Sequence, residues 1–142
     1  MARMYRTETG LAALENATRQ YFLKYRTYPP AGEAGLRLAA GYLSRNVDYL
    51  PGGPPLDGWG RPFQFVPASQ YAEPQWEAIE GPQGYYNPGS YQLFSVGADG
   101  KAGVDNATAQ ADNITNWDRD RSWRAAYARL QEEYRRERPH KP

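Results

Sequence analysis

A chain of 142 residues fits one domain, with a core of modest size and no room for two independent ones. The formal net charge is +1 and charged residues make up 23%, which argues against a nucleic-acid-binding protein or an acidic tail. The absence of cysteine excludes disulfides and thiolate chemistry, while 12 Tyr, 4 Trp, 14 Gly and 12 Pro predict many loops held down by large side chains.

The first predicted element is an amphipathic helix over residues 7–28. Pro29 and Pro30 end it, because proline cannot extend a helix and disfavours helical geometry in the residue before it. The apolar stripe of this helix consists of Leu11, Leu14, Thr18, Tyr21, Phe22 and Tyr25. No apolar run in the sequence is long enough to span a bilayer, and Met1–Tyr5 is too short and too polar for a signal peptide.

A short second helix is expected over residues 31–40, AGEAGLRLAA, with Leu36, Leu38 and Ala39 as its apolar contacts. Residues 44–55 are predicted to form a loop. The run PGGPP within it indicates a rigid turn rather than a ligand for a proline-recognising domain.

Residues 56–66, LDGWGRPFQFV, predict a turn followed by a strand. Asp57 and Gly58 favour the turn, and Trp59 is a packing anchor. Phe63 and Phe65 alternate with a polar residue, which is typical of a half-buried strand.

Residues 67–89 predict an extended surface loop that is rich in Tyr, Pro, Gln and Gly. Its large residues are Tyr71, Trp76, Tyr85 and Tyr86. Such rings can stack on sugars or on a neighbouring subunit, but more often they fasten a loop to its own domain. We therefore assign this loop no chemistry.

The next stretch, residues 91–117, joins a strand to an acidic loop. Tyr91–Val96 is aromatic and β-branched, and the glycines that follow end the strand. The loop offers Asp99, Asp105, Asn106, Asp112 and Asn113. Carboxylate and amide oxygens on a flexible loop suit a hard cation such as calcium, although the same residues also populate ordinary solvated turns. The spacing excludes an EF-hand.

Residues 118–138 predict a further helix with Ser122 as its N-cap. Its apolar stripe is Trp123, Tyr127, Leu130 and Tyr134, and Glu132 is placed to pair with Arg136 one turn away. An apolar stripe of this length requires a surface that covers it. Folding back onto the domain is the favoured prediction, and docking on another subunit is the alternative.

Catalysis has little support in the sequence. The sole histidine, His140, lies in the terminal tail, so histidine-based acid–base or nucleophilic schemes lack a base. There is no Gly-Lys-Ser run that would cradle a phosphate. We therefore predict that the chain is not an enzyme.

Several motifs, in order, resemble one family. SVGADG (residues 95–100) followed by ADNITNW (residues 111–117) resembles the C-terminal calcium loop of the major pseudopilins of type II secretion, the G-type subunits. LAALENATRQYFLKYRTYPP resembles the end of that family's first helix. DGWGRPF resembles its D-P-W-G-x-P-[YF] signature, with Gly58 in place of the first proline. The resemblance covers most of residues 11–117.

The resemblance implies an α+β, type IV pilin-like fold, with the N-terminal helix packed on a small antiparallel sheet formed mainly by Phe63–Val66 and Tyr91–Ser95. A calcium-type loop follows the sheet. The helix over residues 118–138 is additional, because the family usually ends soon after its tryptophan.

The implied function is that of a structural subunit, which associates with further copies of itself, other pseudopilins and secretion-apparatus components in a periplasmic filament that supports protein export. In the family an apolar N-terminal helix anchors the precursor in the inner membrane, and we expect Met1 to replace such a segment. The resemblance also implies methylation. Alternatives are a minor pseudopilin, a type IV pilin, or an extracellular module that binds proteins or glycans.

The resemblance also implies a structural calcium ion. Asp99 matches the acid of the first motif, and Asp112 matches the first acid of the second. Asn113 stands where the family often has another acid, so it offers an amide oxygen without charge. Asp105 in the spacer could restore that charge, and a backbone carbonyl near Val96 is a further expected ligand.

Overall fold

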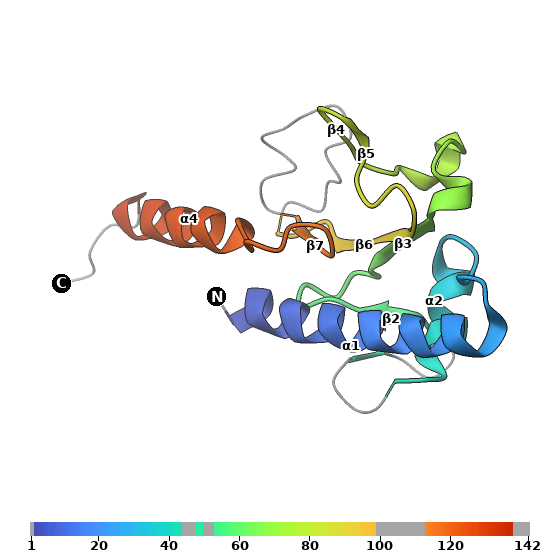
Figure 1. The fold of residues 1–142 in the computed structure, drawn as a ribbon. Helices are drawn as coiled ribbons and strands as arrows, with labels where there is room; N and C mark the ends of the chain where they lie inside the picture. The colour runs from blue at the N-terminus through green and yellow to red at the C-terminus, as the bar shows by residue number, and fades with distance from the viewer. Residues whose placement is uncertain (1, 44–47, 50–52, 99–112, 138–142) are drawn as a thin grey trace.

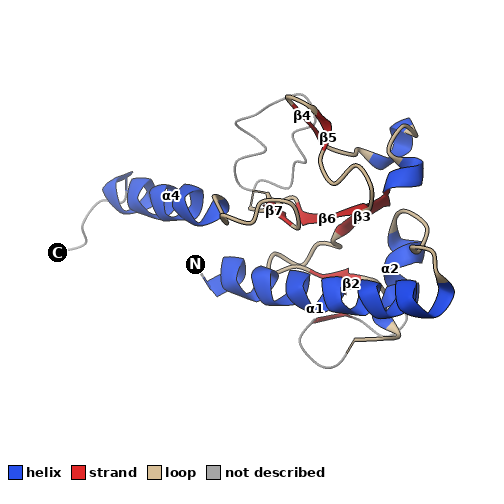
Figure 2. Ribbon diagram, in the orientation of Figure 1, coloured by secondary structure: helices blue, strands red, loops and turns tan. Residues whose placement is uncertain are grey.

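The computed structural model describes residues 2–43, 48–49, 53–98 and 113–137. It has an α+β fold in which one long helix lies along a small antiparallel sheet (Figures 1 and 2). The sheet has the strand order β3 (Gln64–Pro67), β6 (Tyr91–Ser95) and β7 (Ile114–Thr115). The predicted α+β class, with a long N-terminal helix and a small antiparallel sheet, and the pairing of the two main strands are thus confirmed, while β7 was not predicted as a strand.

Helix α1 spans Ala2–Tyr25, so it begins before the predicted Thr7 and ends before Tyr28. Arg26 takes a left-handed backbone conformation (φ 59°), which ends the helix ahead of the two prolines. The buried face consists of Met4, Thr7, Gly10, Leu11, Leu14, Ala17 and Thr18. The predicted stripe is therefore wrong at its end, where Tyr25 is 51% exposed.

Helix α2 (Glu33–Ala40) contacts both α1 and β3. Gly35 is required there, because a Cβ at this position would lie 1.7 Å from the Pro30 carbonyl oxygen. The predicted loop after α2 contains a short antiparallel ribbon of β1 (Asp48–Tyr49) and β2 (Pro55–Leu56). The prediction of an unbroken loop over residues 44–55 was wrong in that respect.

The core lies between the helices and the sheet. Strand β6 is central and pairs antiparallel with both neighbours, with Phe65 opposite Leu93 and Ser95 opposite Ile114. The main buried cluster contains Met4, Leu11, Leu14, Leu36, Phe63, Phe65, Leu93, Ile114, Trp123 and Tyr127. Both ends of the chain thus contribute side chains to the same core.

Residues 67–89 contain two 3₁₀ turns, η1 (Ala68–Gln70) and η2 (Pro74–Trp76), and a small ribbon of β4 (Glu80–Gly81) and β5 (Gly84–Tyr85). The buried Gln92 side chain holds this segment down: it donates to the carbonyls of Ile79 and Tyr86 and accepts from the Ile79 N–H at 2.7 Å. The ring of Tyr71 packs on Tyr85 at 5.1 Å. Tyr71 is also buried in a cluster with Ala31 and Val66, and Tyr86 stacks on Trp117, so the aromatic residues fasten the segment to its own domain.

Helix α4 (Trp123–Glu137) begins five residues after the predicted start at Asp118, because Asp118 instead caps the preceding turn by accepting from the N–H groups of Asp120 and Ser122. Only its first turns fold back. Trp123 and Tyr127 are buried, whereas Leu130 is 47% exposed. The predicted pair of Glu132 with Arg136 is present at 3.6 Å.

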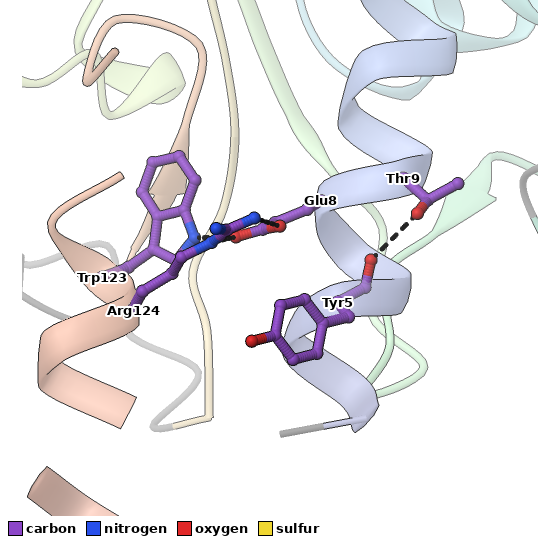
Figure 3. Close-up of polar contacts among 5 residues, drawn as sticks. All are labelled: Tyr5, Glu8, Thr9, Trp123 and Arg124. Atoms are coloured by element: carbon purple, nitrogen blue, oxygen red, sulfur yellow. Dashed lines mark hydrogen bonds and ion pairs between the residues drawn. The ribbon is translucent and has the colours of Figure 1, made fainter. Parts of the chain in front are cut away.

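Glu8 of α1 fastens the start of α4 (Figure 3). Its carboxylate accepts from Trp123 Nε1 at 2.6 Å and from the guanidinium of Arg124 through two bonds of 2.8 Å. The hydrogen bond from Arg124 lowers the pKa of Glu8 below its ordinary value of 4.5. A charge-assisted contact between Glu8 of α1 and Arg124 of α4 therefore joins the two terminal helices.

Candidate functional site

The two ends of the acidic loop meet at one edge of the sheet. Ser95 and Ile114 are paired partners on β6 and β7, so Val96 and Asn113 follow at neighbouring positions where the two strands meet the loop. Both residues are buried, at 7% and 4% exposure. The structure thus brings together these two of the predicted site residues. Asp99, Asp105 and Asp112 lie outside the described residues, so their arrangement stays a prediction.

A buried carboxylate supports the first end of this loop. Asp57 is 4% exposed, and its Oδ1 accepts from the backbone N–H groups of Trp59 (2.9 Å) and Arg61 (3.0 Å). Its Oδ2 accepts from the hydroxyl of Ser95 at 2.7 Å, and the Ser95 Oγ in turn accepts from the Gly97 N–H at 3.1 Å. The turn that begins the signature DGWGRPF is therefore bonded to the first residues of SVGADG.

Arg61 makes a second bond between the two motifs. Its guanidinium donates to the Gly97 carbonyl at 2.7 Å. A cation therefore lies at the start of the loop, where the predicted Ca²⁺ would add positive charge, so binding depends on the loop carboxylates outweighing this repulsion.

Aromatic side chains also hold the two ends of the acidic loop in place. Tyr127 of α4 accepts from the Ala98 N–H at 3.0 Å and stacks on Trp59 with ring centroids 5.4 Å apart. Trp117, which follows β7, stacks face to face on Tyr86 at 5.1 Å and meets Phe94 edge-on. The tryptophan of the second motif therefore joins the loop end to the 67–89 segment.

The departure from the family signature at Gly58 has a structural reason. The Gly58 N–H donates to Thr7 Oγ1 at 2.8 Å, and a Cβ at Gly58 would lie 2.2 Å from the Arg3 carbonyl oxygen. Proline lacks the N–H and would collide with α1. In this chain the turn packs against the backbone of the first helix, which requires glycine.

Sequence reasoning assigned Asp57 only to a turn and gave Arg61 no role. One local signal was present, because an Asp followed by Gly-x-Gly commonly accepts from the next backbone N–H groups. The contacts with Ser95 and Gly97 had no signal in the sequence, since both partners are far along the chain.

Within residues 2–43, 48–49, 53–98 and 113–137, no group of three or more His, Cys, Asp or Glu side chains is placed to hold a metal ion. The same part of the chain contains no helix that is long and apolar enough to cross a membrane.

A comparison with protein-family models finds no match for the chain. The chain is similar to the type II secretion system core protein G of Aeromonas hydrophila, with 30% identity over 116 residues. The matched part covers 77% of this chain and 64% of that protein, so the chain spans less than two thirds of the length of this relative. The relative belongs to the same secretion system that the order of the motifs indicates, and the similarity supports a pseudopilin-like identity.

Proposed function

We propose that this chain is the globular domain of a type II secretion pseudopilin, a structural subunit without catalytic activity. The observation that carries the proposal is the bonding of DGWGRPF to SVGADG through Asp57, Ser95, Arg61 and Gly97. Two motifs that resemble one family in sequence order are thus bonded to each other in the structure. The similarity to core protein G supports the same assignment independently of the contacts.

In the proposed role, copies of the domain assemble with one another and with other secretion components in the periplasm. An apolar N-terminal helix anchors the precursor in the inner membrane. Helix α1, which lies along the sheet, would continue the apolar anchoring helix into the globular domain (Figure 1).

We further propose a structural calcium ion at the acidic loop, held by Asp99, Asp105, Asp112, the Asn113 amide oxygen and the carbonyl of Val96. These donors are all hard oxygens, as calcium prefers. Pairing of β6 with β7 supports the proposal because it holds the loop ends together before any ion binds. The ion would supply a crosslink between strand end and loop, and it would stabilise the fold because it binds the folded state alone.

The secretory role is tested with a chimera. The globular domain of the Aeromonas hydrophila core protein G is replaced by this chain, and release of a secreted enzyme into the medium is measured in cells that lack the native subunit. Restored secretion is expected. A chimera that accumulates in the envelope at the native level but restores no secretion contradicts the proposal.

The calcium site is tested by thermal unfolding of the purified chain in calcium, magnesium and chelator. At a calcium concentration of about 100 times Kd, a gain of about 2.7 kcal/mol is expected, which raises Tm by roughly 5–10 °C. The gain should disappear in Asp99→Ala and persist in Asp120→Ala, a control that removes an exposed carboxylate beyond the loop. Equal melting temperatures in calcium and chelator would show that the loop is a solvated turn.

A further inference from the structure

A groove of about 530 Å³ runs along α1, on the side that faces the segment between β7 and α4. Glu15, Arg19 and Phe22 line it from α1, and Arg119, Arg121 and Trp123 line it from the other side. The α1 wall extends from Glu8 to Phe22, which corresponds to about 21 Å of helix. The groove is therefore long enough to accept several turns of a second helix.

The groove holds charges of both signs. Glu8 is bound by Arg124, but Glu15, Arg19, Arg119 and Arg121 form no ion pair with any residue that the structure describes. Burial raises the pKa of Glu15 from its ordinary value, because its carboxylate is partly desolvated. Arg119 and Arg19 offset this rise of the pKa in part, but neither forms an ion pair with the carboxylate. An occupant that carries both signs of charge would therefore find partners for the carboxylate and for the guanidinium groups.

The distal segment of α4, residues 128–137, is a part of the helix that its own domain does not cover. Helix α4 continues past the N-terminal end of α1 (Figure 1), and every side chain described from residue 128 to residue 136 is exposed. It carries Leu130 together with Arg129, Glu132, Glu133, Arg135 and Arg136. A short helix without tertiary contacts is marginal in water, so a partner that covers it would add stability.

We propose that residues 128–137 of one copy dock into the α1 groove of a second copy. This inference rests on the self-association in the proposed function. The distal segment is about 15 Å long and fits the groove wall. Glu133 and Arg136 lie on the same side of the helix as Leu130. Arg136 would meet Glu15, Glu133 would meet the groove arginines, and Leu130 would cover apolar surface beside Phe22.

The groove of each copy would bind α4 of a neighbouring copy and not the distal segment of its own α4. Trp123, the first residue of α4, is buried at one end of that groove, and the helix leads away from it. A contact between two different surfaces is heterologous, and such contacts extend into open filaments when the rotation does not close a ring. This geometry suits a filament subunit.

The contact is tested by disulfide trapping, since the chain contains no cysteine. Leu130→Cys on one copy is mixed with Arg19→Cys, an exposed groove position one turn from Phe22, on another copy under mild oxidation. The control pairs Leu130→Cys with Leu38→Cys, an equally exposed position on α2. A contact of one helix face is weak in free solution, but binding raises the local concentration of the thiols, so the mixed disulfide should form about tenfold faster than the control.

Charge reversal provides the second measurement. Glu15→Arg on the groove copy should slow the trapping several-fold, and Arg136→Glu on the helix copy should restore it. These positions lie outside the buried core, and far-ultraviolet circular dichroism of each variant verifies its fold. Trapping no faster than the control pair, or fastest between two Leu130→Cys copies, would overturn the proposed contact.

The two proposals fail separately. If the chimera restores secretion while trapping equals the control, the filament uses another surface and the inference is wrong. If trapping is specific while the chimera restores nothing, the contact stands and the secretory assignment is wrong.

Discussion

The carboxylate of Asp57 should be one of the most important polar groups for the stability of this domain. It is buried and accepts three hydrogen bonds, two from backbone N–H groups and one from the Ser95 hydroxyl. Asp57→Ala removes the acceptor and leaves these donors without a partner. Each unsatisfied buried donor costs about 1–3 kcal/mol, so allowing for relaxation we expect a loss of about 3–5 kcal/mol. That is a large fraction of the 5–15 kcal/mol roughly typical of a domain.

The near-isosteric Asp57→Asn should cost less. Its amide oxygen still accepts from the Trp59 and Arg61 N–H groups, and its NH₂ group faces the Ser95 hydroxyl, which can turn and accept. The negative charge of the acceptor is lost. The Ser95 hydroxyl proton also loses its acceptor, while the Ser95 oxygen keeps the bond from the Gly97 N–H. We expect a loss of about 1–2 kcal/mol.

Urea unfolding followed by circular dichroism measures both losses. Asp120→Asn, an exposed acid, is the matched control and should change stability by less than about 0.5 kcal/mol. In a double-mutant cycle, Asp57→Asn and Ser95→Ala should show a coupling of about 1 kcal/mol, because the two side chains touch. The reasoning is refuted if Asp57→Ala costs less than about 1 kcal/mol or if the cycle shows no coupling.

Three further predictions concern other fixed points of the fold. Gln92→Met, which keeps the side-chain length but removes all three bonds to the 67–89 segment, should cost about 2–4 kcal/mol and speed hydrogen exchange there; unchanged exchange would contradict it. The pKa of Glu8 is lowered in the folded state, so its contribution is present above the ordinary value of 4.5 and is lost as pH falls through the folded pKa. Tryptophan fluorescence should therefore report release of α4 in acid, and Glu8→Gln, which loses the bidentate Arg124 pair, should show that release already at neutral pH. Gly58→Ala should lower stability by about 1–3 kcal/mol because its Cβ meets the Arg3 carbonyl, and a neutral effect in urea unfolding would show that α1 can shift.

Local patterns were sufficient to predict several elements. The alternation in FQF and the aromatic run of residues 91–96 correctly predicted β3 and β6, because apolar residues with a period of two indicate a half-buried strand. The end of α1 was misplaced by a few residues, since the left-handed Arg26 ends the helix before the prolines do. Strand β7 was missed because a two-residue strand has too few positions for any period to be visible.

The sequence by itself determined the first helix, the main strands and the acidic composition of the loop, all of which depend on neighbouring residues. Only the tertiary structure decided which distant groups meet. Asp57 and Ser95 are 38 positions apart, and Glu8 and Trp123 are 115 apart. Such contacts form when the chain closes around its core, and no local period encodes them. For the same reason the sequence predicted an apolar stripe along the last helix, while the packed domain decided that only its first turns are covered.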